Sequence, residues 1–260
     1  MTRRHFAISC EGTDLAATLD APDGAAAGAG LLIVSGGNEV RSGMGGAQAR
    51  LAARVAAAGY PVLRFDRRGV GDSAGENRGF RESGAEIAAA LAALRQETGA
   101  TRIVAFGNCD AGSALMLGAG CGADQLVLAN PWTLGDEGDA ALPVHALRAH
   151  YRRRLTNPAA IMRLLRGGVS MGRLARSLLG AAKPSAPANQ LGQAMTAGLA
   201  RFTGPTRILI AGRDRTADAF LGIWDRTDPR IQICAEAGHA FLEPAAEDWL
   251  VGQLLTTLAG

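Results

Sequence analysis

Cysteine and histidine are scarce in this chain, and their spacing predicts neither disulfides nor metal sites. The four cysteines form no Cys-x-x-Cys pair, and with the four histidines they show no spacing that would hold zinc or an iron–sulfur cluster. Such cysteine usage is typical of a reducing compartment rather than of a disulfide-stapled secreted domain. We therefore expect no metal and no cofactor. The cysteines are Cys10, Cys109, Cys121 and Cys234.

Long apolar runs are also lacking. No run approaches the about 18 uninterrupted apolar residues that a membrane span needs. The short apolar stretch near the start is broken by Glu11, which is unlike a signal peptide. We expect a cytoplasmic protein, for which peripheral membrane contact remains an open alternative. Aromatic residues make up only 5% of the chain, so the core must be built from Ala, Leu, Val and Ile.

Acidic residues are missing from one quarter of the chain. Residues 140–206 contain no Asp or Glu but ten Arg and Lys, among them Arg152, Arg153 and Arg154. Because the whole chain sums to +3 and this segment to +10, the remainder sums to −7. Such a segment favours an anionic substrate or an anionic membrane surface, and the alternative is a solvated helix face. It lacks interleaved aromatics and any known binding motif, so we expect no nucleic-acid partner.

The rest of the chain alternates apolar strands with helices. This alternation predicts an α/β fold with a mostly parallel, doubly wound sheet that is covered on both faces. A hairpin is predicted to precede it, with strands at 5–9 and 15–19. The other predicted strands are 31–34, 61–65, 103–106, 125–130, 207–211 and 230–234, and the predicted helices are 47–58, 82–97, 113–119 and 245–258.

One connection is too long for a simple crossover. Roughly 75 residues separate the strand at 125–130 from the strand at 207–211, whereas crossovers are usually far shorter. We interpret 132–206 as a basic helical lid over the C-terminal edge of the sheet, leaving 1–131 and 207–260 as the core. The lid helices are predicted at 143–151, 158–165 and 171–179.

The stretch around Cys109 has the pattern of a nucleophile elbow. A buried strand, Ile103–Phe106, runs into Gly107–Ala111, and a helix-compatible apolar segment follows. Small residues two before and two after Cys109 permit the sharp turn that lifts such an apex residue above the sheet edge. The helix N-terminus would ease ionisation of the thiol and stabilise an oxyanion. The alternative is an ordinary buried core cysteine.

Two further strand ends carry the partners that a thiol nucleophile needs. Asp214 follows the strand at 207–211, and His239 follows the strand at 230–234. A histidine can take the thiol proton, and a carboxylate on its other nitrogen fixes the tautomer. Each also has a plainer interpretation, since Asp214 could cap a helix and His239 could be a surface residue. Asp218 is the second choice of acid, and the histidines at 145 and 150 are less favoured bases.

The whole pattern resembles the α/β-hydrolase superfamily. The order Cys109, Asp214, His239 is similar to its nucleophile–acid–base order, and Asp66–Ser73 resembles its D-x-R-G-x-G-x-S turn. Cysteine replaces the commoner serine, as in dienelactone hydrolases. More narrowly, Phe106–Leu117, together with Asn130–Trp132 and Gly212–Ala217, resembles exosortase A system-associated hydrolases of the first type. The resemblance implies an α/β-hydrolase fold with a helical lid and a link to exopolysaccharide and protein-sorting gene clusters.

The resemblance also implies where an oxyanion would be bound. Its donors would be the backbone N–H of Asp110 and that of Gly37 or Asn38. The Gly36–Gly37 pair after the strand at 31–34 suits such a loop, although an ordinary strand-to-helix turn would look the same. The Asp110 carboxylate would oppose thiolate formation beside Cys109 unless it points away or pairs with an arginine.

These features predict an acyl-enzyme hydrolase. A cysteine nucleophile with a histidine base suits hydrolysis of an ester, lactone or thioester, with a small and anionic acyl compound as the substrate. Two alternatives remain at this stage. The same triad could pass the acyl group to an alcohol or amine, or the chain could be a non-catalytic protein of this fold that binds a ligand through the lid.

Overall fold

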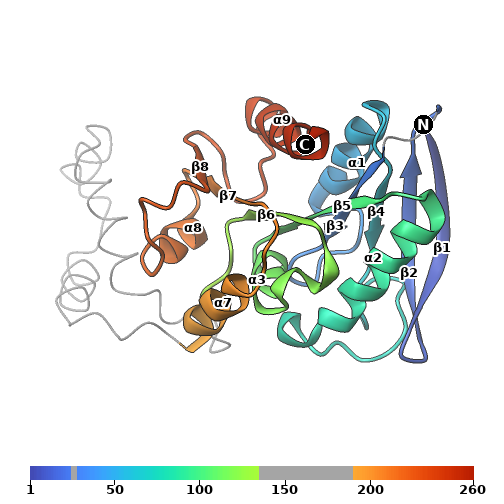
Figure 1. Cartoon of the computed structure of the whole chain (residues 1–260), viewed down its shortest axis with the longest axis horizontal. Helices are drawn as coiled ribbons and strands as arrows, with labels where there is room; N and C mark the ends of the chain where they lie inside the picture. Colours follow the sequence, from blue (N-terminus) through green and yellow to red (C-terminus); the bar gives the residue numbers. More distant parts are fainter. Residues whose placement is uncertain (25–27, 135–189) are drawn as a thin grey trace, which may run out of the picture.

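The computed structural model describes residues 1–24, 28–134 and 190–260, and these form one sheet with helices on both faces (Figure 1). The eight strands follow the order β1-β2-β4-β3-β5-β6-β7-β8. Strands β1, β2 and β4 pair antiparallel, and all other neighbours pair parallel. The strands are β1 (Thr2–Cys10), β2 (Thr13–Ala21), β3 (Ala29–Val34), β4 (Val62–Phe65), β5 (Arg102–Asn108), β6 (Gln125–Ala129), β7 (Thr206–Ala211) and β8 (Ile231–Cys234).

This architecture confirms the predicted α/β-hydrolase fold with its mostly parallel sheet. The helices are α1 (Ala47–Ala57), α2 (Gly84–Thr98), α3 (Asp110–Leu117), α7 (Gln190–Ala200), α8 (Arg215–Phe220) and α9 (Pro244–Ala259). Short 3-10 turns occur at η1 (Met44–Gly46), η2 (Phe80–Glu82) and η3 (Ala119–Gly122). Helix α3 begins three residues earlier than the sequence indicated, because it starts directly after the turn at Cys109.

The core consists of two apolar layers separated by the sheet. Along β3, Leu32 and Val34 belong to one layer, whereas Leu31 and Ile33 belong to the other, as the alternation of a strand requires. Helices α2, α3 and α7 cover the first face, and α1 and α9 cover the second (Figure 1). Both faces are therefore buried, which explains the continuous apolar runs of the central strands.

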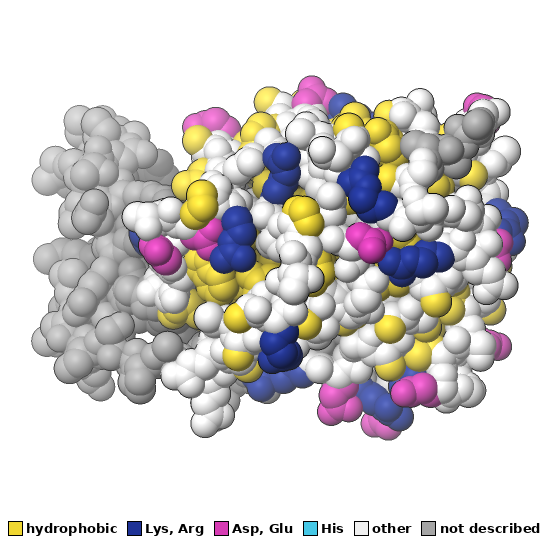
Figure 2. Space-filling model, viewed as in Figure 1, with side chains coloured by type: hydrophobic (Ala, Val, Ile, Leu, Met, Phe, Trp, Pro, Cys, Tyr) yellow, Lys and Arg dark blue, Asp and Glu magenta, His cyan; other side chains and the backbone are white. Residues whose placement is uncertain are grey.

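The predicted lid range is described only at its ends. Residues 135–189, which include the predicted lid helices, Arg152, Arg153 and Arg154, lie outside the described residues, so the lid remains a prediction. Residues 190–200 form α7, which packs against α3. In the described parts of the chain, no helix combines the length and apolarity that crossing a membrane requires. Basic and acidic side chains are interspersed on the described part of the face shown in Figure 2.

The contact between α7 and α3 depends on Gly198. A Cβ atom at this position would lie 2.2 Å from the Met116 carbonyl oxygen and 2.9 Å from that of Leu117. We expect Gly198→Ala to lower the free energy of unfolding by about 2 kcal/mol, because the helices must separate to relieve the clash. Urea denaturation measures this.

Gly252 on α9 provides the matched control for that substitution. A Cβ there would meet no heavy atom within 4 Å. Gly252→Ala should therefore raise stability by up to about 1 kcal/mol through helix propensity alone. Equal effects of the two substitutions would show that the α3–α7 contact does not require a glycine.

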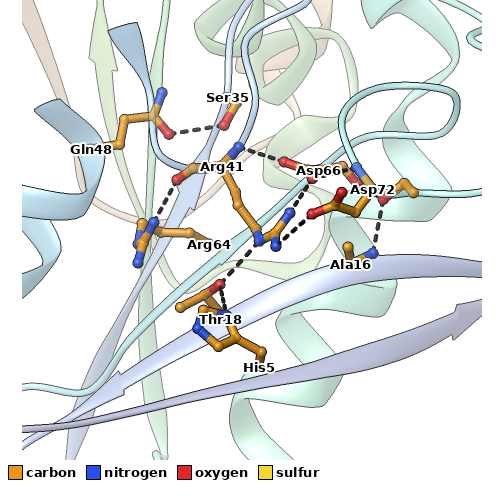
Figure 3. Close-up of polar contacts among 10 residues, drawn as sticks. His5, Ala16, Thr18, Ser35, Arg41, Gln48, Arg64, Asp66 and Asp72 are labelled. Atoms are coloured by element: carbon orange, nitrogen blue, oxygen red, sulfur yellow. Dashed lines mark hydrogen bonds and ion pairs between the residues drawn. The ribbon is translucent and has the colours of Figure 1, made fainter. Parts of the chain in front are cut away.

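The turn after β4 is held by a polar network (Figure 3). The Asp66 carboxylate accepts hydrogen bonds from the backbone N–H and the guanidinium of Arg41, and from Asp72 N at 3.0 Å. Ser73 Oγ donates to Asp66 O at 2.7 Å and accepts from Ala16 N of β2 at 2.8 Å. A Cβ on Gly71 would lie 2.3 Å from Asp66 Oδ2, so the turn requires glycine there. This network fixes the position of the residues between Asp66 and Ser73.

Candidate active site

Cys109 sits at a strained apex between β5 and α3. Its backbone has φ 60° and ψ −129°, a conformation that non-glycine residues seldom adopt. A Cβ on Gly107 would lie 2.7 Å from the carbonyl carbon of Ala111, so no larger residue fits two positions before the apex. The local sequence thus dictates the turn, which lifts Cys109 to the carboxyl edge of the sheet. Its side chain is partly exposed rather than buried in the core.

Asp214 makes both of the contacts that its position allowed, one with the start of α8 and one with His239. Its Oδ1 accepts Thr216 N at 3.0 Å and its Oδ2 accepts Ala217 N at 3.1 Å, so it caps α8. The same Oδ2 lies 2.8 Å from His239 Nδ1. Asp218, the second choice of acid, is buried on α8. The cap holds the carboxylate rigidly, and this rigidity orients the imidazole.

His239 lies between Asp214 and Cys109. The hydrogen bond with the Asp214 carboxylate, and next the hydrogen bond with the Cys109 sulfur, raise the pKa of His239 to about 10 from its usual 6.5. Both interactions stabilise the imidazolium, and they outweigh the opposing effect of burial. The structure therefore places the His239 imidazole between Asp214 Oδ2 and the Cys109 sulfur.

The raised pKa of His239 makes a prediction about stability. A histidine whose pKa is higher in the folded state stabilises the fold fully below about pH 6.5 and loses that contribution as the pH rises towards 10. We expect the wild type to exceed His239→Gln in free energy of unfolding at pH 6, and the difference to shrink by pH 10. Denaturation of both proteins across this range tests it. A difference that stays constant or grows with pH would contradict it.

Two asparagines that the sequence reasoning did not select hold the backbone of the histidine loop. Asn108 Nδ2 and Asn130 Nδ2 donate to the carbonyl oxygen of His239 at 3.1 and 3.0 Å. Asn130 Oδ1 in turn accepts the N–H of Ala211 at 2.8 Å. Asn130 is fully buried with φ 42°, so it links β6, β7 and the loop that carries His239. Its sequence signals were a polar residue at the end of a buried strand and its place in the Asn130–Trp132 motif, and neither indicated this role.

The loop after β3 lies against the nucleophile elbow. A Cβ on Gly36 would lie 2.6 Å from Asn108 O and 3.4 Å from the Cβ of Cys109. Gly37 N donates to Asp110 Oδ1 at 2.6 Å, so this predicted oxyanion donor is occupied by a side chain. Asn38 N has no acceptor within the described ranges 1–24, 28–134 and 190–260. The backbone N–H of Asp110 is at the first turn of α3, where helical N–H groups have no partner in their own helix.

The Asp110 carboxylate does not act as an isolated charge beside the thiol. Its Oδ2 lies 3.5 Å from Arg67 Nη2, and its Oδ1 accepts the N–H of Gly37. The arginine partner and the backbone donor both offset its negative charge. Asp110 thus pairs with an arginine, which is one of the two arrangements in which we expected its carboxylate not to oppose thiolate formation at Cys109.

A small pocket adjoins the site between α1 and α9. It has a volume of about 50 Å³ and includes Asn108 of the elbow and Ala240 after the histidine. Its walls are mostly apolar, with Phe106, Phe241 and Leu250 among them. Within the described residues, no three His, Cys, Asp or Glu side chains come close enough to hold a metal ion.

Comparisons with known proteins agree with this architecture. The model of the alpha/beta hydrolase family matches residues 31–253. The structure is similar to an alpha-beta serine hydrolase homologue from Coxiella burnetii, with a TM-score of 0.60 and 16% identity, covering 99% of this chain and 98% of that one. It is similar to a Pyrococcus furiosus esterase, with a TM-score of 0.61 and 14% identity, covering 100% and 92% of the two chains.

A third similar structure is the thioesterase domain from the curacin biosynthetic pathway. It has a TM-score of 0.55 and 14% identity, and the match covers 98% of this chain and 100% of that one. A comparison with curated protein sequences finds no match. At these identities the structural likeness concerns the fold.

Proposed function

The chain belongs to the alpha/beta hydrolase family, and from that membership we propose that it hydrolyses an ester, lactone or thioester with Cys109 as the nucleophile. The observation that carries the proposal is the contact series from Cys109 through His239 to Asp214 at the carboxyl edge of the sheet. Side chains of these three types in this order are what acyl transfer to a thiol requires.

The proposed reaction proceeds in two steps. His239 holds the proton of the Cys109 thiol, and the thiolate attacks the carbonyl carbon of the substrate. The oxyanion is stabilised by backbone N–H groups, and the imidazolium then gives its proton to the leaving group as the carbonyl re-forms. In the second step His239 takes a proton from water, and the resulting hydroxide attacks the thioester. The acid is released, and the thiol regains its proton from His239.

The substrate class is also part of this proposal. The ten basic residues of 140–206 favour an anionic acyl compound such as a coenzyme A thioester. The motif resemblance to exosortase A system-associated hydrolases supports a role in exopolysaccharide-linked metabolism. We propose that the protein acts in the cytoplasm, where such thioesters and a reduced thiol coexist.

Alkylation of the thiols against pH tests the proposal without knowledge of the substrate. Iodoacetamide is applied to the wild type and to His239→Ala, and each cysteine is followed by peptide mass spectrometry. We expect Cys109 to react well below pH 8 in the wild type and to lose this reactivity in His239→Ala, because the histidine holds the thiol proton.

The other cysteines provide internal controls in the same sample. Burial raises the pKa of Cys121 to about 11, so it should stay unreactive across the range. Cys10 is buried as well. A Cys109 that reacts no faster than Cys10, Cys121 and Cys234 would contradict the proposal and favour a non-catalytic binding protein.

A further inference from the structure

Arg67 lies where three loops meet, although the family motif leaves its position variable. Because the strand order places β4, β3 and β5 side by side, the loops that follow these strands are neighbours at the carboxyl edge. Arg67 extends from the turn after β4, donates to the carbonyl oxygen of Gly37 after β3, and pairs with Asp110 after β5 at 3.5 Å. It is only 4% exposed, so its guanidinium is a buried bridge between the loops.

The loop after β3 is a tight turn whose central peptide joins Gly37 to Asn38. Glu39 N donates to Gly36 O at 3.1 Å, which closes the turn, and Gly37 has φ 58°. In such turns the central peptide can face either way, and its direction distinguishes the turn types. Its C=O and N–H point in opposite directions because the peptide is planar and trans. Whatever holds the Gly37 carbonyl therefore also fixes the direction of the Asn38 N–H.

We propose that Arg67 is a positioning residue that sets the Gly37–Asn38 peptide so that the Asn38 N–H, together with that of Asp110, stabilises the oxyanion. The inference rests on the proposed function. Gly37 cannot be the second donor while Asp110 Oδ1 accepts its N–H at 2.6 Å. The Asn38 side chain is anchored separately, since its Oδ1 accepts Asn77 Nδ2 at 2.8 Å, and within the described residues its N–H has no acceptor.

The flipped peptide explains why such a residue is needed. It would direct the Gly37 carbonyl, rather than the Asn38 N–H, at the developing negative charge, and the two oxygens would repel. Arg67 opposes this flip by donating to the carbonyl, and Asp110 holds the same glycine by its N–H. The Nη1 atom of Arg67 is buried with no partner in the described parts of the chain, an uncompensated cost of the kind that functional sites carry.

Two reactions of the Cys109 thiol distinguish a role of Arg67 in the oxyanion hole from its other possible roles. With p-nitrophenyl acetate, the Cys109 thiolate attacks the carbonyl carbon, an oxyanion forms, and p-nitrophenolate leaves. With iodoacetamide, the thiolate displaces iodide from carbon and no oxyanion forms. A defect in the oxyanion hole should therefore slow the first reaction and leave the second unchanged.

We expect Arg67→Lys and Arg67→Gln to slow acylation of Cys109 by p-nitrophenyl acetate about 100-fold, the usual effect of losing one oxyanion donor. In Arg67→Lys, which keeps a positive charge beside Asp110, the rate of alkylation by iodoacetamide against pH should match the wild type. Arg68→Lys is the matched control, because Arg68 is equally buried in the same turn but binds Glu11 and the carbonyl oxygen of Cys10. It should leave the ratio of the two rates unchanged.

Each other outcome overturns the inference. Arg67 variants acylated as fast as the wild type would show that the peptide needs no arginine. Equal losses in acylation and alkylation would show that Arg67 acts through the thiol or the fold. A wild type that is alkylated only slowly and not acylated at all would overturn the proposed function as well, so the two failures are distinguishable.

Discussion

Cys109→Ala is expected to lower kcat/KM for p-nitrophenyl acetate by about 10⁵-fold or more. The substitution removes the atom that forms the covalent bond. Deleting the nucleophile of a catalytic triad lowers the rate by this much because the other triad residues contribute only together with it. The measurement is steady-state release of p-nitrophenolate, combined with the intact mass of the protein to detect an acetyl adduct. The adduct should be present in the wild type and missing from the variant.

Cys121→Ala is the matched control for this loss. Cys121 lies in η3, away from the elbow, and its environment keeps the thiol protonated. The control should retain wild-type activity and the acetyl adduct. Wild-type activity in Cys109→Ala would refute the cysteine nucleophile.

Cys109→Ser refines the same test. Serine differs from cysteine only in its γ atom, so the elbow should accept serine without a change of shape. A hydroxyl needs a neutral histidine to take its proton, whereas the Asp214 carboxylate stabilises the protonated form of His239. We expect an activity between those of the wild type and Cys109→Ala, with an optimum at higher pH than the wild type. A serine variant more active than the wild type would argue that the thiol is not the natural nucleophile.

Asp214→Asn should lower kcat by about 10⁴-fold, as loss of the orienting carboxylate does in Ser-His-Asp hydrolysis. The side-chain Oδ2 accepts both His239 Nδ1 and Ala217 N, so an amide nitrogen in its place would face the Ala217 N–H. If the asparagine amide takes the opposite orientation, its nitrogen faces the Thr216 N–H instead. In the wild type that N–H donates to Oδ1 of Asp214. Asparagine can therefore satisfy only part of this set of donors. Turnover of p-nitrophenyl acetate between pH 6 and 9 measures the effect.

The stability of the same variant separates the two roles of Asp214. Loss of its cap on α8 should cost about 1 kcal/mol, which is far too little to unfold the protein and explain a 10⁴-fold loss of turnover. Asp218→Asn on the same helix is the control. If it lowered turnover more than Asp214→Asn, the acid would have to be reassigned to Asp218.

The elements of the core followed from local patterns. Apolar runs between glycines and prolines predicted the strands from β3 to β8, and the structure places them in the parallel sheet that their alternation with helices implied. The hairpin was predicted too, although β1 and β2 extend beyond 5–9 and 15–19 because pairing with a neighbour adds residues that propensity alone leaves undecided. Residues 135–189 lie outside the described part, so the lid is still a prediction.

The candidate site could also be predicted from the sequence only in part. The small residues around Cys109 indicated the elbow because that turn is a local steric matter. The Asp214–His239 pair could be suspected from strand ends, but its 2.8 Å contact joins residues 25 positions apart in sequence. Asn130, Arg67 and the occupied N–H of Gly37 could not be anticipated, because each depends on which loops become neighbours.

By itself the sequence determined the strands, the helices of the core and the sharp turn at Cys109, since each depends on side-chain periodicity or on space within a few residues. The tertiary structure alone decided which groups of the neighbouring loops contact one another beside Cys109. Arg67 reaches Gly37 and Asp110 only because β3 lies between β4 and β5 in the sheet, and that order is a property of strand pairing across the whole chain. Short stretches of sequence thus indicate which residue types form the site, whereas the distances between them depend on the fold of the whole chain.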